Sequence, residues 1–325
     1  MTKANIDLAK EGDNFPYQFH DPAAYAQNLS HYYNFKLEGY DSCVLGYVHA
    51  SIAVKIAQSS NWKLTTGGTA PACGTLTFTP RRNGEPVSSL ADRNEVLGLE
   101  LQSLRERNEF KVLNGWRNEK YPIYGPNREL LLSMERSCTP LFGVVTYGIH
   151  MTAFVRTDEG IKIWTPRRSL TKPTYPGMMD NTVAGGMSTG EEPFECLVRE
   201  CDEEASLPEH VVQSAHAVGI LTYFHVRDSR AGGETGLCQP ECQYIYDLEL
   251  PADVVPKPND DEAIDFQLLS IQDLHTALAN GKFKPNCALV LLDFFVRHGI
   301  ITPQNEPDYI EIVARLHRRL EFPTR

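Results

Sequence analysis

The sequence predicts an α/β protein with two domains. Its 325 residues exceed the length that a single hydrophobic core normally serves. Helical and strand patterns are mixed in the first part of the chain, whereas from Pro140 onward strand-like runs surround one strongly acidic helix. We therefore expect a smaller mixed α/β domain over residues 1–140 and a second α/β domain over residues 141–325.

The elements expected in the first domain are short. They are a helix over residues 22–33 and strands over residues 35–37, 44–48 and 75–78. The longest helix is expected over residues 88–107, because Ser88 or Ser89 can cap its first turn. Its many charges of both signs predict a surface helix with one buried side. The apolar stripe consists of Leu90, Leu97, Leu101 and Leu104.

The second domain is dominated by strand patterns. Strands are expected over residues 141–156, 161–168, 182–186, 217–226, 242–250 and 263–270. Helices are expected over residues 271–280, 286–298 and 309–320, the first of them ended by Gly281. The acidic helix lies within residues 185–207, between the third and fourth of these strands.

Composition excludes several classes of partner. Asp and Glu number 42 against 31 Lys and Arg, a net charge of −11, and no basic run is interleaved with aromatic residues, so we expect no nucleic-acid partner. Neither a signal core nor an apolar run of membrane length is present, which predicts a soluble, cytoplasmic protein without a membrane partner. The Cys238 and Cys242 pair lacks a second pair of ligands for zinc. The oligomeric state is left open.

The acidic helix has two different faces. With about 100° of rotation per residue, Glu200, Glu203 and Glu204 fall within one arc, and an apolar set falls within another. Carboxylates this close repel one another and resist full ionisation unless a divalent cation lies between them. Ligands that are all oxygen select a hard ion, so the cofactor predicted is Mg²⁺ or Mn²⁺.

The spacing around this helix resembles the Nudix box. Gly185, Glu191 and Arg199 precede the three glutamates at the positions of that motif. Two departures are Cys201 at an aliphatic position and Ser206 in place of a helix-ending glycine. Neither removes a carboxylate, and Pro208 can still end the helix because a proline disfavours helical geometry at the residue before it.

The resemblance implies a Nudix α/β/α sandwich and a set of roles. Glu200, Glu203, Glu204 and the carbonyl of Gly185 would hold the metal. Glu191 would orient Arg199 by an ion pair, and Arg199 would hold a box carboxylate in place. The general base would be Glu200 or Glu262, and the sequence does not decide between them.

Further site residues are expected on both sides of the box. Arg167, Arg168 and Lys172 are candidates for binding the outer oxygens of a diphosphate substrate. Downstream, an acidic loop precedes a strand, and Nudix enzymes commonly take an additional metal ligand or base from such a loop. Glu262 is the candidate there, with Asp261 as its reserve.

The match extends beyond the box to residues 164–186, to the acidic loop and to parts of the first domain. It resembles the Nudix hydrolases related to thiamine pyrophosphokinase, which carry their own N-terminal domain. This implies Mg²⁺-dependent hydrolysis of thiamine diphosphate analogues, oxidised or otherwise damaged, to the monophosphate and phosphate. Alternatives are a nucleotide-sugar, dinucleotide or other nucleoside diphosphate substrate, isopentenyl-diphosphate isomerisation, and a non-catalytic diphosphate sensor. The isomerase needs a cysteine just after the Asn181-Thr182 step, where Val183 stands.

Overall fold

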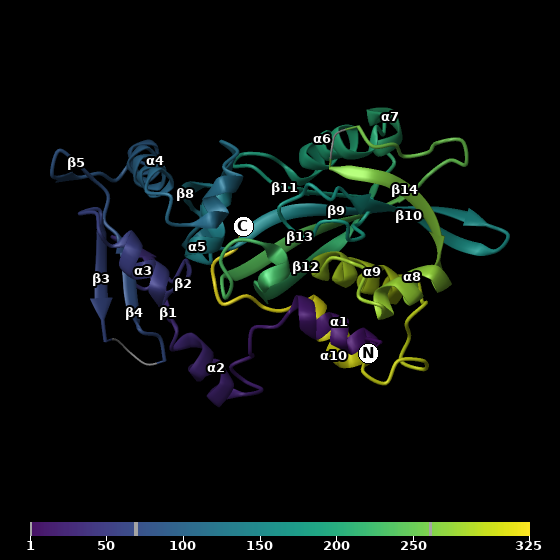
Figure 1. The fold of residues 1–325 in the computed structure, drawn as a ribbon, viewed down its shortest axis with the longest axis horizontal. Coiled ribbons are helices and arrows are strands. Elements are labelled where there is room, and N and C mark those ends of the chain that lie inside the picture. The colour runs from purple at the N-terminus through teal and green to yellow at the C-terminus, as the bar shows by residue number, and fades with distance from the viewer. Residues whose placement is uncertain (1, 68–70, 260–261) are drawn as a thin grey trace.

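The computed structural model of the chain describes residues 2–67, 71–259 and 262–325. Two larger β-sheets organise this part of the chain, one of four strands and one of six (Figure 1). The four-stranded sheet comes first in sequence, and the six-stranded sheet lies between helices on its two faces. No helix within the described residues is long and apolar enough to cross a membrane.

The four-stranded sheet has the order β2-β1-β4-β3. Its strands are β1 (Tyr32–Leu37), β2 (Gly46–His49), β3 (Trp62–Thr66) and β4 (Gly74–Phe78). β1 and β4 are parallel, and the other two pairs are antiparallel. Helix α2 (Pro22–Leu29) ends earlier than the sequence pattern predicts, because Tyr32 and Tyr33 already belong to β1.

Helix α4 (Leu90–Glu106) covers this sheet together with α3 (Ala50–Ile56). The Oγ of Ser89 accepts a hydrogen bond from the Asp92 N–H at 3.1 Å, which caps the helix as expected. Leu97, Leu101 and Leu104 are buried, whereas Leu90, at the first turn, is only partly buried. The buried side therefore begins one turn later than predicted.

Short elements connect the two sheets. They are β5 (Arg81–Arg82), β6 (Glu85–Pro86), η1 (Lys111–Gly115), β7 (Lys120–Tyr124), η2 (Pro126–Arg128), β8 (Leu130–Glu135), η3 (Arg136–Cys138) and α5 (Thr139–Phe142). The strand expected from residue 141 is wrong over its first residues. Pro140 occupies the first turn of α5, and Gly143 ends this helix in the left-handed conformation at φ 58°.

The six-stranded sheet has the order β12-β13-β9-β10-β14, and β11 pairs with β9. Its strands are β9 (Thr146–Thr157), β10 (Gly160–Arg168), β11 (Val183–Gly186), β12 (His216–Val226), β13 (Cys238–Glu249) and β14 (Ala263–Ser270). β9 and β13 are parallel, and the other pairs are antiparallel. β9 is buried on both faces, which explains its nearly continuous apolar sequence.

Helices cover both faces of this sheet (Figure 1). One face carries α6 (Pro193–Ala205) and α7 (Glu209–Val212); the other carries α8 (Ile271–Ala279), α9 (Pro285–Arg297), α10 (Tyr309–Leu316) and α1 (Asn5–Gly12). This confirms the predicted class, a Nudix-type α/β/α sandwich preceded by a smaller α/β unit. The sequence patterns did not predict α1, which packs on α9. The division of the chain near residue 140 stays a prediction.

A buried ion pair joins the first and last parts of the chain. Arg318 donates to Asp13 Oδ1 at 3.2 Å and to the carbonyl of Phe15 at 2.6 Å. Asp13 also accepts the N–H of Phe224 in β12 at 2.9 Å. Both side chains are almost fully buried. Burial raises the pKa of Asp13, and the charge of Arg318 opposes that rise.

We predict that Arg318→Met lowers the free energy of unfolding by about 3 kcal/mol at neutral pH, because it removes one ion-pair partner of the buried Asp13 carboxylate and leaves Arg315 at 3.5 Å. A carboxyl group with a raised pKa is least costly when protonated, so the loss should shrink as pH falls. Urea denaturation at pH 7 and pH 5 measures both effects. Arg319→Met, an exposed neighbour, is the control. An equal loss at the two pH values contradicts the assignment to Asp13.

Candidate active site

Helix α6 carries the three box glutamates. It begins at Pro193, where the Glu192 N–H donates to Glu195 Oε2 at 3.2 Å, and it ends at Ala205. Ser206 then takes the left-handed conformation at φ 52°, the role that glycine has at many helix ends. Ser206 therefore ends the helix itself, and Pro208 instead precedes α7.

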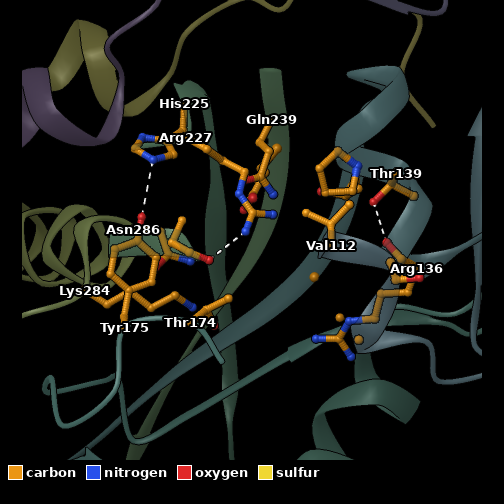
Figure 2. A pocket seen from close by; sticks show the side chains of 18 of the residues that line it. Val112, Arg136, Thr139, Thr174, Tyr175, His225, Arg227, Gln239, Lys284 and Asn286 are labelled. Carbon is orange, nitrogen blue, oxygen red and sulfur yellow. Dashed lines mark hydrogen bonds between the residues drawn. The ribbon is translucent and has the colours of Figure 1, made fainter. Parts of the chain in front are cut away.

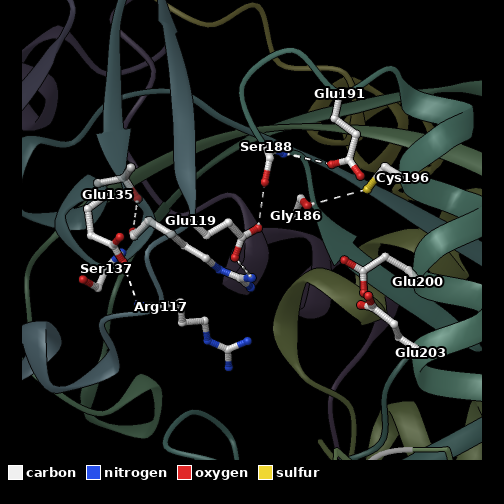
Figure 3. A network of polar contacts seen from close by, with 12 residues as sticks. Arg117, Glu119, Glu135, Ser137, Gly186, Ser188, Glu191, Cys196, Glu200 and Glu203 are labelled. Carbon is white, nitrogen blue, oxygen red and sulfur yellow. Dashed lines mark hydrogen bonds and ion pairs between the residues drawn. The ribbon is translucent and has the colours of Figure 1, made fainter. Parts of the chain in front are cut away.

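The glutamates face a polar cavity of about 300 Å³. Its acidic lining residues are Glu119, Glu200, Glu203, Glu204 and Glu262, and its basic ones are Arg117, Arg136 and Arg199. Figure 3 shows Glu200 and Glu203 on α6 facing Arg117 and Glu119 from the first part of the chain. The structure thus brings the box glutamates together with Glu262, as expected from the sequence. It also places Glu119, Arg117 and Arg136 in the lining of this cavity, and the sequence did not predict these three residues.

Arg199 is held between carboxylates. Its Nε lies 2.8 Å from Glu191 Oε1, and its terminal nitrogen lies 2.7 Å from Glu200 Oε1 and 3.2 Å from Glu203 Oε2. Burial opposes ionisation of Glu191, but the hydrogen bonds from Arg199 and from the Ser188 N–H lower its pKa below the usual value. The geometry contains the ion pairs that the Nudix resemblance implies for Glu191 and Arg199.

Gly185 lies directly against the side chain of Glu200. It is in β11 opposite Ile149 of β9, and a Cβ added there would overlap with the carboxyl group of Glu200. At Gly186 an added Cβ would overlap with the Tyr121 hydroxyl. The close approach of Glu200 on helix α6 to Gly185, and of Tyr121 on β7 to Gly186, therefore favours glycine at both positions, and the Gly185 backbone lies at the wall of the cavity.

The environment of Glu200 and Glu204 disfavours their ionised forms. Burial is the main cause that raises both pKa values, and the charge of Glu200 raises that of Glu204 further. Arg199 opposes the rise at Glu200, and the Ala184 N–H, 3.0 Å from Glu204 Oε2, opposes it at Glu204. Two buried carboxylates that resist ionisation are a donor set that fits a hard divalent cation.

In the arrangement described, no three His, Cys, Asp or Glu side chains of residues 2–67, 71–259 and 262–325 converge as metal ligands. The reason is visible at Arg199, which bridges Glu200 and Glu203. Glu203 is half exposed, so its side chain is free to rotate away from Arg199.

The three predicted substrate cations lie outside the cavity lining. Arg168 pairs with Asp180 at 2.6 Å, and exposed Arg167 lies 4.0 Å from Asp265. Lys172 forms an ion pair with Glu262, which does line the cavity. Their role in substrate binding stays a prediction.

Glu262 stands between two cations. Besides Lys172, it has Arg117 at 3.7 Å. Burial opposes ionisation, but the hydrogen bond and charge of Lys172 and then the charge of Arg117 lower its pKa. Glu262 is therefore ionised at neutral pH. Asp261, its reserve, lies outside the described residues.

A larger cavity of about 430 Å³ adjoins the acidic one. Arg117, Arg136, Ala184 and Gly185 line both. In Figure 2, Thr174, Tyr175, Lys284 and Asn286 lie on one side of it, and Val112, Arg136 and Thr139 lie on the other.

Sequence reasoning missed this larger cavity, although one signal was present. Gln239, Glu241 and Gln243 place a polar residue at every second position of β13, and all three line the cavity. Buried Cys238 and Cys242 alternate with them, so this strand presents one polar face and one packed face.

The comparisons with known proteins confirm the predicted Nudix domain. A family model described as the NUDIX domain matches residues 146–288, and one described as a domain of unknown function (DUF4743) matches residues 85–146. Uncharacterized protein YJR142W of Saccharomyces cerevisiae is 40% identical over 239 residues, which is 71% of this chain and 70% of the yeast protein.

Two further similarities extend the comparison. Nudix hydrolase 20, chloroplastic, of Arabidopsis thaliana is 31% identical over 283 residues, which is 85% of this chain and 71% of the plant protein. A crystal structure of DR0079 from Deinococcus radiodurans is 21% identical with a TM-score of 0.38, and the match covers 62% of this chain and 100% of that one. From the extent of these sequence matches, the chain belongs to the Nudix hydrolase family.

Proposed function

We propose that the chain is a Mg²⁺- or Mn²⁺-dependent pyrophosphohydrolase that converts thiamine diphosphate analogues, including oxidised or damaged forms, to the monophosphate and phosphate. The observation that carries this proposal is the pair of adjoining cavities. The smaller one gathers carboxylates for a metal, and the larger one has the volume of a small-molecule site. Arg117 and Arg136 line both, where a diphosphate would pass between them.

Glu200, Glu203, Glu204 and the carbonyl of Gly185 would hold the metal. These are hard oxygen donors, which favour Mg²⁺ or Mn²⁺ over softer ions. A metal ion bound there supplies charge neutralisation for the leaving phosphate and a water of lowered pKa. The repulsion that raises the pKa values of Glu200 and Glu204 is the reason why the site gains from a cation.

The side chains of the protein then perform three tasks. Arg199, fixed by Glu191, positions the box carboxylates. Arg117 and Arg136 bind the outer phosphate oxygens. Glu200 or Glu262 accepts the proton of the attacking water, and both line the cavity where that water would stand.

The thiamine assignment draws on the resemblance over residues 164–186 and on the walls of the larger cavity. Residues of η1 and η3, from the first part of the chain, form one wall, so this part of the protein contributes to substrate choice. A nucleotide sugar, a dinucleotide or another nucleoside diphosphate derivative is the alternative substrate.

Phosphate and monophosphate release from thiamine diphosphate, its 4-oxo analogue, nucleoside diphosphates and nucleotide sugars, measured with Mg²⁺, tests the function. We expect the highest kcat/KM for the thiamine derivatives. A preference for a nucleotide substrate selects the alternative, and complete inactivity with every diphosphate refutes the proposal.

We predict that Glu203→Gln or Glu204→Gln lowers kcat/KM at least a hundredfold, a loss of about 2.7 kcal/mol of transition-state stabilisation. Each substitution keeps the shape of the side chain and removes the charge of a metal ligand. Glu195→Gln, exposed on the same helix, is the matched control and should retain full activity. Half of the wild-type rate in a folded Glu204→Gln variant is incompatible with the assigned role.

We also predict a pH-dependent stabilisation by Mg²⁺. A carboxyl group whose pKa is raised in the folded protein favours folding when protonated, so stability without metal should fall as pH rises above about 4.5. Mg²⁺ should therefore raise Tm more at pH 8 than at pH 5.5. Melting curves with EDTA or Mg²⁺ at both pH values measure this effect. Glu204→Gln should raise Tm in EDTA at pH 8 and reduce the increase caused by Mg²⁺; a lower Tm in EDTA contradicts the explanation.

A further inference from the structure

Glu241 is the one acidic side chain among the described residues that line the larger cavity. It lies on β13 opposite Tyr223 of β12. The Tyr223 hydroxyl donates to Glu241 Oε2 at 2.6 Å, and Gln243 Nε2 donates to the same oxygen at 2.7 Å. Tyr223 is buried, and burial followed by the charge of Glu241 raises its pKa well above the usual value. Tyr223 is therefore a permanent donor, and the carboxylate is fixed in place.

Two acceptor atoms are left over at this point of the cavity. Both hydrogen bonds end on Glu241 Oε2, so Oε1 accepts none from the described residues. The Oε1 of Gln243 is also without a hydrogen-bond partner, although this side chain is only 6% exposed. A buried acceptor without a donor costs free energy, which a ligand that brings N–H groups recovers. The orientation of Gln243 follows from the network, because the reverse one would set its oxygen against the carboxylate.

The sheet fixes how far these acceptors lie from the acidic cavity. Gln243 of β13 is paired with Gly148 of β9, and Gly148 is paired with Gly186 of β11. Adjacent strands are about 4.8 Å apart, so the acceptors lie two strands, or roughly 10 Å, from the Gly185–Gly186 edge. Gly148 brings no side chain into the interval. One ligand can therefore reach both places.

The charges of the remaining lining residues indicate which end of a ligand would lie at each place. The other ionised groups of the larger cavity are the cations Lys111, Arg117, Arg136, Arg227 and Lys284. Arg227 donates to the carbonyls of Ala231 and Gly232 at 2.6 and 2.9 Å, so its side chain stabilises the loop between β12 and β13. Arg117 and Arg136 stand at the boundary with the acidic cavity. An anionic group fits that boundary, and an N–H donor fits the place of Glu241.

We propose that Glu241 binds the N–H donors of a nitrogen heterocycle on the substrate while the diphosphate lies at the acidic cavity. This inference rests on the proposed function and names the part of the substrate that the larger cavity selects. Glu241 is a binding residue that determines specificity, and Tyr223 and Gln243 position its carboxylate.

Calorimetric titration in EDTA tests this role without catalysis. The ligands are thiamine monophosphate, AMP and CMP, which carry amino heterocycles, and isopentenyl monophosphate, which has no N–H group. The variant is Glu241→Gln, whose amide oxygen can keep the contacts of Oε2 and so places an NH₂ group where Oε1 stood. Glu249→Gln is the matched control, because Glu249 is exposed on the same strand and pairs with Arg156.

We expect wild type and Glu249→Gln to bind at least one of the amino heterocycles with the same Kd. Glu241→Gln should weaken that binding on the order of 10- to 100-fold, the range for a hydrogen bond to a charged group. Its Kd for isopentenyl monophosphate should change less than twofold. Tyr223→Phe should give a smaller loss with the same selectivity.

Three results overturn the proposal: no binding of any amino heterocycle by wild type, an unchanged Kd in Glu241→Gln, or an equal loss for isopentenyl monophosphate. The last of these assigns Glu241 a structural role. If Glu241-dependent binding is present but no diphosphate is hydrolysed with Mg²⁺, the proposed function fails and the recognition site stands.

Discussion

The site depends on carboxylates that are buried against a glycine-rich strand. Glu200 packs on Gly185, and Glu204 accepts the N–H of Ala184, so helix α6 is drawn close to β11. That closeness sets their charges against each other with little water between them. Arg199 offsets part of the repulsion, and Glu191 holds Arg199 in place. The spacing of the box thus places each charged residue beside a partner that stabilises it.

The first part of the chain completes this site. Arg117 and Arg136 reach both cavities, and Glu119 reaches the acidic one. This part also contacts the connection between β12 and β13. There, Glu234 accepts the N–H groups of Lys111 and Val112 at 2.6 and 3.1 Å. The box carboxylates thus come from the second part of the chain, whereas the walls of both cavities also include residues of the first part, so a change of that segment would change the site without changing the box.

The sequence alone identified the part of the site whose residues are contiguous in the chain, which is the box. The box lies on one strand, one loop and one helix, so its spacing translates directly into geometry, and the class of the fold follows from it. Arg117, Arg136 and Glu241 were missed because they lie outside the box in the sequence and reach the cavities only through the tertiary fold, which no local pattern encodes. Ser206 was misjudged for a different reason. A non-glycine residue in the left-handed conformation is uncommon, and only the packing around the end of α6 shows that serine accepts it here.

The balance of charge in the two cavities links metal, phosphate and heterocycle. In the acidic cavity five glutamates face three arginines, so with all of them ionised a surplus of two negative charges would repel a diphosphate. One divalent cation would cancel that surplus and would itself attract the phosphate oxygens. Further attraction would come from Arg117 and Arg136 at the boundary and from contacts to the rest of the substrate. The recognition site proposed at Glu241 would therefore contribute to turnover as well as to choice, because it would hold the substrate where the acidic cavity alone would not.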